Sequence, residues 1–250
     1  MTPDREGPAP GTFGNGLFAG QQVAVIGGTS GIGAAVAALF ASLGASVVAA
    51  GLGAAGAPPE LGGARVAELD VTDGAAVSSF FGGLRELHVL VNCAGIINRG
   101  REFDLAVFAR VLEVNLTATM RTCTAARAAL ARCGGCIINT ASMLTFFGGA
   151  LVPGYAASKG GVGQLTKSLA IAYAPDRVRV NAVAPGWIRT GLTADLAASA
   201  DRSAKLLDRT PLGRWGEPAD IAPVVAFLAS PAAGFITGAI VPVDGGYCAA

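Results

Sequence analysis

The sequence is poor in charge. Of its 250 residues only 18 are lysine or arginine and 17 are aspartate or glutamate, which leaves a formal net charge of +1. This balance excludes the basic face of a nucleic-acid-binding protein and the acidic tail of a charged disordered chain. Apolar residues make up 52% of the chain, and abundant glycine and alanine favour tightly packed helices and strands over disorder.

Paired cysteines and histidines are also scarce. The five cysteines are an odd number without framework spacing, and His88 is the only histidine. Because the N-terminal "MTPDREGPAP" lacks the apolar core of an export signal, we expect reduced thiols and a cytoplasmic location. The "CGGC" stretch at 133–136 resembles a metal or redox pair but has no second pair. A turn that leads into a strand is the favoured interpretation, and no metal site is expected.

No charged residue lies between Glu6 and Glu60, and the run from Ala34 to Ala57 resembles a membrane span. A span needs about 20 consecutive residues of apolar helix. Here Gly44 ends an alanine-rich helix, and the β-branched "ASVVAA" that follows is typical of a strand. Two short buried elements therefore explain the run, and we expect no membrane association.

Apolar strands alternate with helical stretches along most of the chain. Residues 1–19 are rich in glycine and proline without periodicity, so they are predicted to be a flexible lead-in. Residues 20–250 contain no composition break and no repeat, and we predict one domain. Strands separated by helices predict an α/β fold, a Rossmann-like doubly wound parallel sheet with helices on both faces. We expect about seven strands, near 22–27, 46–50, 64–70, 87–92, 135–142, 177–185 and 239–246, and one long helix over 106–131.

The first expected strand runs into a glycine-rich turn. In "VAVIGGTSGIG" (23–33) the strand is followed by Gly27, Gly31 and Gly33 at the mouth of a helix. Glycines let the backbone approach a pyrophosphate, whose charge meets the free N–H groups at the start of the helix. The spacing is not G-x-G-x-x-G. The position of the turn, after a strand and before a helix, is what indicates a dinucleotide site.

Further motifs follow this turn in order. Tyr155 stands four residues before Lys159 in "YAASK", and Ser142 stands thirteen residues before Tyr155. With Gly27-x-x-x-Gly31-x-Gly33, "NCAG" at 92–95, "PGWIRT" at 185–190 and "VDGG" at 243–246, the chain resembles the short-chain dehydrogenase/reductase family, in its compact single-domain branch. The resemblance covers roughly residue 20 to the end. It implies an NAD(P)-dependent oxidoreductase that interconverts a secondary alcohol and a ketone by hydride transfer.

The chain departs from the family pattern at two positions. Ile26 stands where the family usually has a threonine before the first motif glycine, and Cys93 stands where it usually has a second asparagine. In the family these side chains brace the glycine turn and the central strand. The departures therefore affect the expected local hydrogen bonds more than the expected chemistry.

Tyr155 and Lys159 are one helical turn apart, so both side chains can face one cleft. A free phenol has a pKa of about 10, and a nearby cation can lower such a value by roughly one to three units. An ammonium group at this spacing can thus turn a tyrosine into a general base. The resemblance implies that Tyr155 exchanges the proton with substrate and that Lys159 lowers its pKa and holds the nicotinamide ribose. It further implies that Ser142 binds the substrate oxygen, and that Asn115 anchors a water that relays the proton.

The dinucleotide contacts are also implied by the resemblance. At the end of the second strand, where an acid would bind ribose and a basic residue a 2′-phosphate, this chain has uncharged Gly51 and Leu52. A phosphate binds poorly without a cation, so NAD is favoured over NADP. The implied contacts are Gly27, Thr29, Ser30, Gly31, Ile32, Gly33, Gly51, Leu52, Asp70, Val71, Asn92, Ala94, Gly95, Tyr155, Lys159, Pro185, Gly186, Ile188 and Thr190.

The substrate side is less defined by the sequence. Residues 191–215 are expected to be a mobile lid. Arg99, Arg101 and Arg189 are candidates for binding a substrate anion, although they lie in loops of unknown direction. The resemblance implies a homotetramer or dimer. Two other activities stay open: a catalytically silent dinucleotide sensor or scaffold, and a lyase or epimerase with a transient hydride. The expected apolar pocket wall is Met143, Leu144, Phe146, Phe147, Leu151, Trp187 and Leu192.

Overall fold

The computed structural model describes residues 13–58 and 61–250. In that part of the chain, seven parallel strands form one sheet in the order β3-β2-β1-β4-β5-β6-β7, which confirms the predicted doubly wound fold. The order reverses between β1 and β4, so the chain crosses to both faces of the sheet. The strands are β1 (Gln22–Ile26), β2 (Ser46–Gly51), β3 (Arg65–Glu68), β4 (Val89–Asn92), β5 (Cys136–Thr140), β6 (Arg179–Pro185) and β7 (Ile240–Val243).

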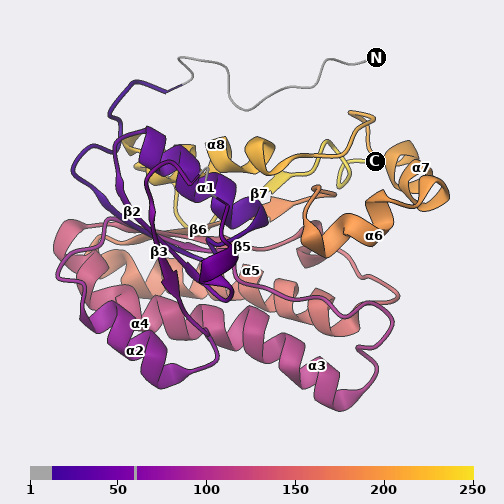
Figure 1. The fold of residues 1–250 in the computed structure, drawn as a ribbon, viewed down its shortest axis with the longest axis horizontal. Coiled ribbons are helices and arrows are strands. Elements are labelled where there is room, and N and C mark those ends of the chain that lie inside the picture. Colours follow the sequence, from indigo (N-terminus) through magenta and orange to yellow (C-terminus); the bar gives the residue numbers. More distant parts are fainter. Residues whose placement is uncertain (1–12, 59–60) are drawn as a thin grey trace.

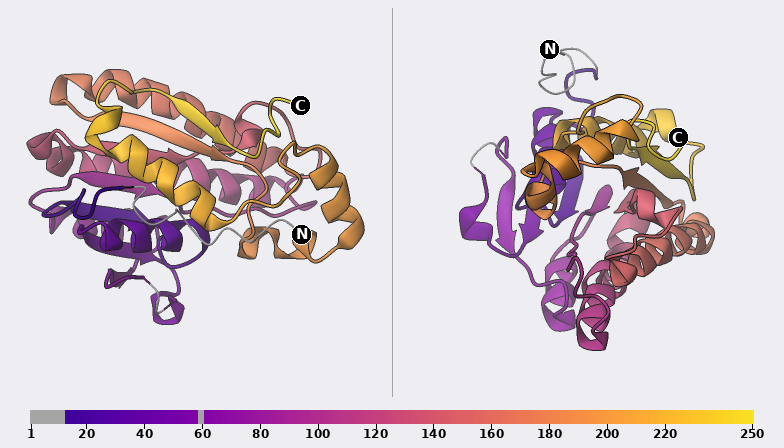
Figure 2. Two further views of the ribbon diagram at one scale, coloured as in Figure 1. Left: turned by 90° about the horizontal axis from the view of Figure 1, so that it is seen from above. Right: turned by 90° about the vertical axis from the view of Figure 1, so that its right-hand side faces the viewer.

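Helices cover the two faces of the sheet, as Figures 1 and 2 show. The α-helices are α1 (Gly31–Ser42), α2 (Gly74–Gly82), α3 (Leu105–Leu112), α4 (Ala118–Cys133), α5 (Pro153–Tyr173), α6 (Ala194–Ala197), α7 (Ala200–Asp208) and α8 (Pro218–Ala229). Short 3₁₀ segments are η1 (Ala54–Gly56), η3 (Met143–Thr145), η4 (Ala174–Asp176), η5 (Gly191–Thr193) and η6 (Pro231–Ala233). A π-helical turn, η2 (Glu113–Thr117), joins α3 to α4.

Two apolar cores lie on the two faces of the sheet. Helices α1 and α8 pack on one face, where Phe40 and Val225 are completely buried. Helices α2, α4 and α5 pack on the other, where Leu130 and Tyr173 are buried. The central strands β1, β4 and β5 contribute apolar side chains to both cores, and for this reason their sequences are continuous apolar runs rather than alternating patterns.

The predicted lead-in ends inside the packed fold. Residues 1–12 lie outside the described residues. Phe18, near the end of the predicted stretch, is completely buried and packs edge-on against Phe40 with ring centroids 4.7 Å apart. The residues just before β1 therefore cover the end of α1 and are not a loose tail.

The run that resembles a membrane span consists of two elements. Helix α1 ends at Ser42, Gly44 has φ of +92°, and β2 follows directly. Within the described ranges, no helix is long and apolar enough to cross a bilayer. The "CGGC" stretch is likewise the expected turn, because Cys133 ends α4, Gly134 adopts a left-handed conformation, and Cys136 begins β5.

The expected single helix over 106–131 is interrupted. The π-helical turn at 113–117 separates α3 from α4. It contains Asn115, whose amide group binds the backbone of Ile96 in the loop after β4. Turns of this kind add one residue to the helical repeat and recur at functional sites. Hydrophobic periodicity does not reveal such a turn, because the apolar face continues on both sides of it.

Candidate active site

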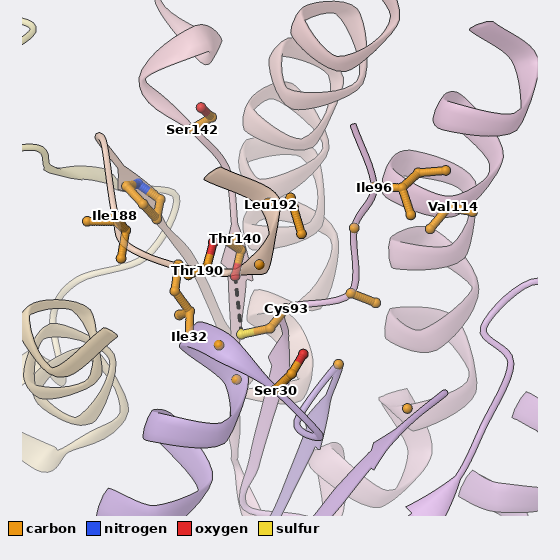
Figure 3. Close-up of a pocket in the computed structure, with 18 of the residues that line it drawn as sticks. Ser30, Ile32, Cys93, Ile96, Val114, Thr140, Ser142, Ile188, Thr190 and Leu192 are labelled. Atoms are coloured by element: carbon orange, nitrogen blue, oxygen red, sulfur yellow. Dashed lines mark hydrogen bonds between the residues drawn. The ribbon is translucent and has the colours of Figure 1, made fainter. Parts of the chain in front are cut away.

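A cavity of about 360 Å³ lies at the carboxyl ends of the strands, where the sheet order reverses. This is the place where open α/β sheets bind ligands. Figure 3 shows its walls, with Ser30 and Ile32 from the start of α1 on one side and Ile96 and Val114 on the other. The carboxyl ends of six strands, β1 to β6, and the loops after them thus contribute to one site.

The glycine turn fits a dinucleotide phosphate. A Cβ atom on Gly27 would collide with the backbone of Ala94, and one on Gly33 would collide with the carbonyl oxygen of Gly27. Gly27 also has φ of +77°, which L side chains rarely adopt. The N-cap residue Ser30 makes no side-chain cap, and the first turn of α1 has no acidic residue. The first N–H groups of α1 are therefore available to an anion of the size of a pyrophosphate.

Most of the predicted cofactor contacts line this cavity. Asp70 and Asn92 do not, and neither does the predicted proton-relay residue Asn115. The predicted residues that line it are Gly27, Thr29, Ser30, Gly31, Ile32, Gly33, Gly51, Leu52, Val71, Ala94, Gly95, Ser142, Tyr155, Lys159, Pro185, Gly186, Ile188 and Thr190.

Asp70 and Asn92 have structural partners instead. The Asp70 carboxylate accepts hydrogen bonds from the backbone N–H and the hydroxyl of Thr72, both at 2.8 Å, and these bonds lower its pKa. Asn92 is buried and donates to the side-chain oxygen of Asn139 on β5 at 3.0 Å. Asn92 therefore braces the two central strands beneath the cavity, behind the residues that form its wall.

Tyr155 and Lys159 lie on the first turns of α5 and face the cavity together, as the spacing predicts. The Lys159 Nζ donates to the carbonyl oxygen of Thr140 at 2.6 Å and lies 5.6 Å from the centre of the Tyr155 ring. The Ser142 hydroxyl, two residues after β5, acts on the Tyr155 phenol and lowers its pKa. The Ser142 hydroxyl also caps η3 by accepting from the N–H of Leu144 at 3.2 Å.

Burial dominates the electrostatics of Tyr155 and Lys159. Burial raises the pKa of Tyr155, whereas its hydrogen bond with Ser142 and the charge of Arg99 act to lower it. Burial also lowers the pKa of Lys159 itself to about 8. The Lys159 ammonium donates to the Thr140 carbonyl, and burial disfavours its charge. That Lys159 acidifies Tyr155 stays a prediction.

Asn115 is completely buried in the π-helical turn, and both N–H groups of its amide are engaged. The Nδ2 atom donates to the Ile96 carbonyl at 2.9 Å and to the Ser158 hydroxyl at 3.0 Å, while Oδ1 accepts from the Ile96 N–H at 2.8 Å. Asn115 therefore ties the loop after β4 to α5 directly behind Tyr155 and Lys159. Any water that it holds must be a donor to its oxygen lone pairs.

Glu102 is a site residue that sequence reasoning missed. Its carboxylate is only 1% exposed, and it accepts from the backbone N–H of Tyr155 at 2.7 Å and from that of Asn98 at 2.8 Å. It therefore binds a free N–H group in the first turn of α5 and ties the backbone that carries Tyr155 to the loop after β4. Nothing in "RGREFD" distinguishes this glutamate from a surface residue, because its partner is far away in the sequence.

Cys93 replaces the expected asparagine with a weaker contact. The Thr140 hydroxyl lies 3.4 Å from the Cys93 sulfur, and Figure 3 marks this hydrogen bond at the floor of the cavity. A thiol is a poor acceptor, so the brace between β4 and β5 depends more on the Asn92–Asn139 pair. Burial raises the pKa of Cys93, and the thiol is therefore uncharged beside Lys159.

A second cavity, of about 470 Å³, lies beside the first. The two share Ser142, Tyr155, Gly186, Leu192 and Thr193. The predicted lid, residues 191–215, forms one wall of the second cavity through η5, α6 and α7. Among the expected apolar wall residues, Phe146 is half-exposed and not part of the lining, whereas the others contribute to it: Met143, Leu144, Phe147, Leu151, Trp187 and Leu192.

Only one of the three arginines suggested by the sequence reaches this cavity. Arg99 lines it, Arg101 does not, and Arg189 pairs instead with Glu217 at 3.1 Å. Helix α7 contributes two further basic residues, Arg202 and Lys205, which are not among the sequence-based candidates.

Comparisons with known proteins agree with this geometry. A family model described as enoyl-(acyl carrier protein) reductase matches residues 26–248. Galactitol 2-dehydrogenase (L-tagatose-forming) of Cereibacter sphaeroides is 40% identical over 245 residues, which cover 91% of this chain and 95% of the relative. The chain belongs to the short-chain dehydrogenase/reductase family. It is an NAD(P)-dependent oxidoreductase that interconverts an alcohol and a ketone.

One more relative and one solved structure are similar to this chain over nearly its whole length. Cis-4-hydroxycyclohexanecarboxylate dehydrogenase of Sinomonas cyclohexanicum is 41% identical over 250 residues, covering 93% of this chain and 98% of the relative. A crystal structure from Agrobacterium tumefaciens with bound NADP, provisionally described as a 2-deoxy-D-gluconate 3-dehydrogenase, superposes with a TM-score of 0.86. It is 39% identical and covers 95% of this chain and 100% of the other.

Proposed function

We propose that this short-chain dehydrogenase/reductase binds a dinucleotide in the first cavity and a secondary alcohol in the second, with Tyr155 as the proton-transfer group. One observation carries the proposal: Ser142 and Tyr155 line both cavities, and the Ser142 hydroxyl acts on the Tyr155 phenol to lower its pKa, whereas the third shared hydroxyl, that of Thr193, donates to the Ile188 carbonyl. A substrate oxygen that contacts both hydroxyls has its carbon at the junction of the two cavities. Only there can a carbon atom meet the cofactor while its oxygen exchanges a proton.

The chain's own residues handle the proton. In alcohol oxidation, the substrate O–H bond breaks, its proton moves to the Tyr155 oxygen, and its electron pair forms the second carbon–oxygen bond. A bound dinucleotide would supply the hydride chemistry at the same carbon, as the hydride acceptor in alcohol oxidation and the hydride donor in ketone reduction. Ser142 donates to the substrate oxygen and holds it in place. Lys159 is proposed to hold the ribose, and Asn115 to orient the water that carries the proton outward.

The direction of the Tyr155 pKa has a consequence for pH dependence. Oxidation requires the phenolate and reduction requires the phenol. Because burial raises the pKa of Tyr155, the phenol is the resting form at neutral pH. We therefore expect kcat/KM for alcohol oxidation to rise as the pH increases above 7, and that for ketone reduction to fall. Equal pH profiles in the two directions would contradict this assignment.

The cofactor contacts are proposed from the lining of the first cavity. Gly27, Gly31 and Gly33 with the start of α1 would hold the pyrophosphate, and Gly51 the adenosine ribose. The proposed contacts of the nicotinamide end are Pro185, Gly186, Ile188 and Thr190, which follow β6 and line the same cavity. Asp70 would contact the adenine through its backbone, since its carboxylate is already bound by Thr72.

We further propose that NAD(H) is preferred over NADP(H). The ribose end of the cavity is formed by Gly51 and Leu52, and the nearby backbone N–H groups of Gly53 and Ala54 already donate to the Glu68 carboxylate, at 3.1 and 2.8 Å. A 2′-phosphate there would meet a negative charge instead of free donors. Measured kcat/KM values with the two cofactors test this preference. A clear advantage of NADPH would refute it.

The test of the catalytic assignment is Tyr155→Phe. We expect it to reduce turnover by at least about a hundredfold, because general acid–base catalysis contributes roughly that much or more. The affinity for NADH, measured by fluorescence titration, should stay within about threefold of wild type because the dinucleotide turn is untouched. Leu105→Ala, an exposed position on α3, is a matched surface control. Retained turnover in Tyr155→Phe would overturn the assignment.

We also propose that copies of this chain associate and that the protein is cytoplasmic. Helices α4 and α5 expose Met120 and Ile171, and such apolar surface favours association of copies into a dimer or homotetramer through these helices. Light scattering of the purified protein measures the mass directly. The five cysteines are all free, including the buried Cys123 and Cys136, which agrees with a cytoplasmic location.

A further inference from the structure

The second cavity has a strongly one-sided charge. Its lining includes Arg99, Arg202, Lys205 and Arg209. No aspartate or glutamate belongs to the described lining of this cavity. Four positive groups thus gather in one cavity of a chain whose formal net charge is +1. Charge of one sign inside a cleft attracts ligands of the opposite sign.

Three of the four basic side chains come from one face of the lid. Arg202, Lys205, Leu206 and Arg209 follow the i, i+3, i+4, i+7 spacing along and just after α7, and all of them line the cavity. Over seven residues such a face runs for about 10 Å. Asp201 and Asp208 belong to the same helix but not to the lining. The lid therefore turns its basic side chains and a leucine to the substrate cavity.

Arg99 lies in the loop after β4 and approaches this face from the side of the catalytic tyrosine. Burial lowers the pKa of Arg99, and the charge of Arg202 acts in the same direction. Tyr155, Glu102 and Asp195 act in the opposite direction. Arg99 is thus within electrostatic reach of both the phenol and the lid, and the two guanidinium groups repel each other. A bound anion between them would remove this repulsion.

The basic side chains of the cavity are not committed to ion pairs. In the part of the chain that the structure describes, the ion pairs of arginine involve Arg121, Arg127, Arg189 and Arg214, which lie outside this cavity. Arg209 is held instead by two aromatic rings, with its guanidinium carbon 4.4 Å from the centre of Tyr247 and 5.2 Å from that of Phe147. Stacking fixes the plane of a guanidinium and leaves its N–H donors free.

We propose that the substrate is an anionic secondary alcohol, whose hydrocarbon body contacts the apolar wall and whose carboxylate or phosphate binds Arg99, Arg202 and Arg209. This proposal rests on the function proposed above, since it names the substrate class of the same site. Guanidinium groups bind both kinds of anion with paired hydrogen bonds. Met143, Leu144 and Leu196 provide the apolar part of the wall. The anion thereby fixes which carbon of the body reaches Ser142 and Tyr155.

The first experiment measures binding without turnover. Cyclohexanecarboxylate, neutral cyclohexanecarboxamide and cyclohexyl phosphate are titrated calorimetrically into the enzyme–NADH complex. We expect the carboxylate or the phosphate to bind at least about tenfold more tightly than the amide, and to lose this advantage in high salt. The anion that binds more tightly shows whether the site prefers a carboxylate or a phosphate on the substrate. Equal affinity of all three compounds would overturn the proposal while leaving the oxidoreductase function intact.

The second experiment uses variants. Arg202→Gln should weaken binding of the preferred anion about tenfold or more and leave binding of the amide unchanged. With 4-hydroxycyclohexanecarboxylate and cyclohexanol as substrates, the same variant should raise KM for the acid at least about tenfold more than KM for cyclohexanol. Arg101→Gln makes the same change of charge in the Arg99 loop outside the cavity and serves as the control. Equal effects of the two variants would refute the anion site. Absence of turnover with both alcohols would count against the proposed function. The binding data would still show whether the second cavity prefers an anionic ligand.

Discussion

The buried ammonium group of Lys159 should make the stability of the enzyme depend on pH. Lys159 is only 4% exposed, and burial lowers its pKa from 10.5 to about 8. Above pH 8 the folded protein therefore loses a proton that the unfolded chain keeps until about pH 10.5. The unfolded state binds more protons throughout this window, so stability rises with pH there. The gain in the free energy of unfolding is complete above pH 10.5, and it is lost as the pH falls through 8.

The size of the effect follows from the shift. One pKa unit corresponds to about 1.4 kcal/mol, so a shift from 10.5 to about 8 amounts to roughly 3 kcal/mol at its limit. At pH 9.5, some 1.5 units above the folded pKa, about 2 kcal/mol of it should be present. Lys159→Met removes the titrating group. It also removes the bond to the Thr140 carbonyl, a loss that does not depend on pH.

Urea unfolding of wild type and Lys159→Met at pH 7.5, 8.5 and 9.5 tests the reasoning. Protein concentration is held constant, because association of subunits would shift the transition. Tyr155 and Cys93 also titrate in both proteins, so the difference between the two curves is the informative quantity. We expect the free energy of unfolding of wild type to gain about 2 kcal/mol relative to the variant between the first and last pH. Parallel curves would show that Lys159 keeps its charge when buried.

The remaining predictions concern the turn, the α5 start and the thiols. Gly33→Ala should weaken NADH binding at least about tenfold, because the new Cβ meets the Gly27 carbonyl; Gly82→Ala, which meets nothing within 4 Å, should not. Glu102→Gln should lower both kcat and the melting temperature measured by calorimetry, since an amide cannot accept from both N–H groups that the carboxylate now binds. An unchanged kcat would show that the position of Tyr155 does not depend on Glu102. Burial raises the pKa of Cys136 to about 11, so a disulfide reagent at pH 8 should label this thiol only after unfolding, and rapid labelling of the native enzyme would contradict its burial.

The α/β architecture was predictable because it depends on short-range patterns. Continuous apolar runs such as that of β5 and glycines such as Gly44 mark the strands and the ends of helices. The glycine turn after β1 was predictable for the same reason, since its residues are neighbours in the sequence. The interruption at Asn115 was not, because a π-helical turn is stabilised by side-chain bonds to Ile96 in another loop.

The placement of the catalytic residues was only partly predictable. Helical spacing alone puts Tyr155 and Lys159 on one side of α5. It does not tell where the ammonium group points, and the structure directs it to Thr140, a strand residue on β5. The carboxylate that binds the start of α5 comes from Glu102, 53 residues earlier in the chain. Long-range hydrogen bonds of this kind depend on packing that no local pattern records.

The order of strands and helices along the chain, the phosphate-binding turn and the family of this protein could be predicted from the sequence, because each depends on neighbouring residues or on motifs in a fixed order. The electrostatics of the site could not, because they depend on the folded arrangement. Burial sets the protonation of Tyr155 and Lys159, and the fold brings the basic face of α7 opposite Arg99. Charge–charge energies and desolvation depend on distances in space, and these exist only once the chain has folded.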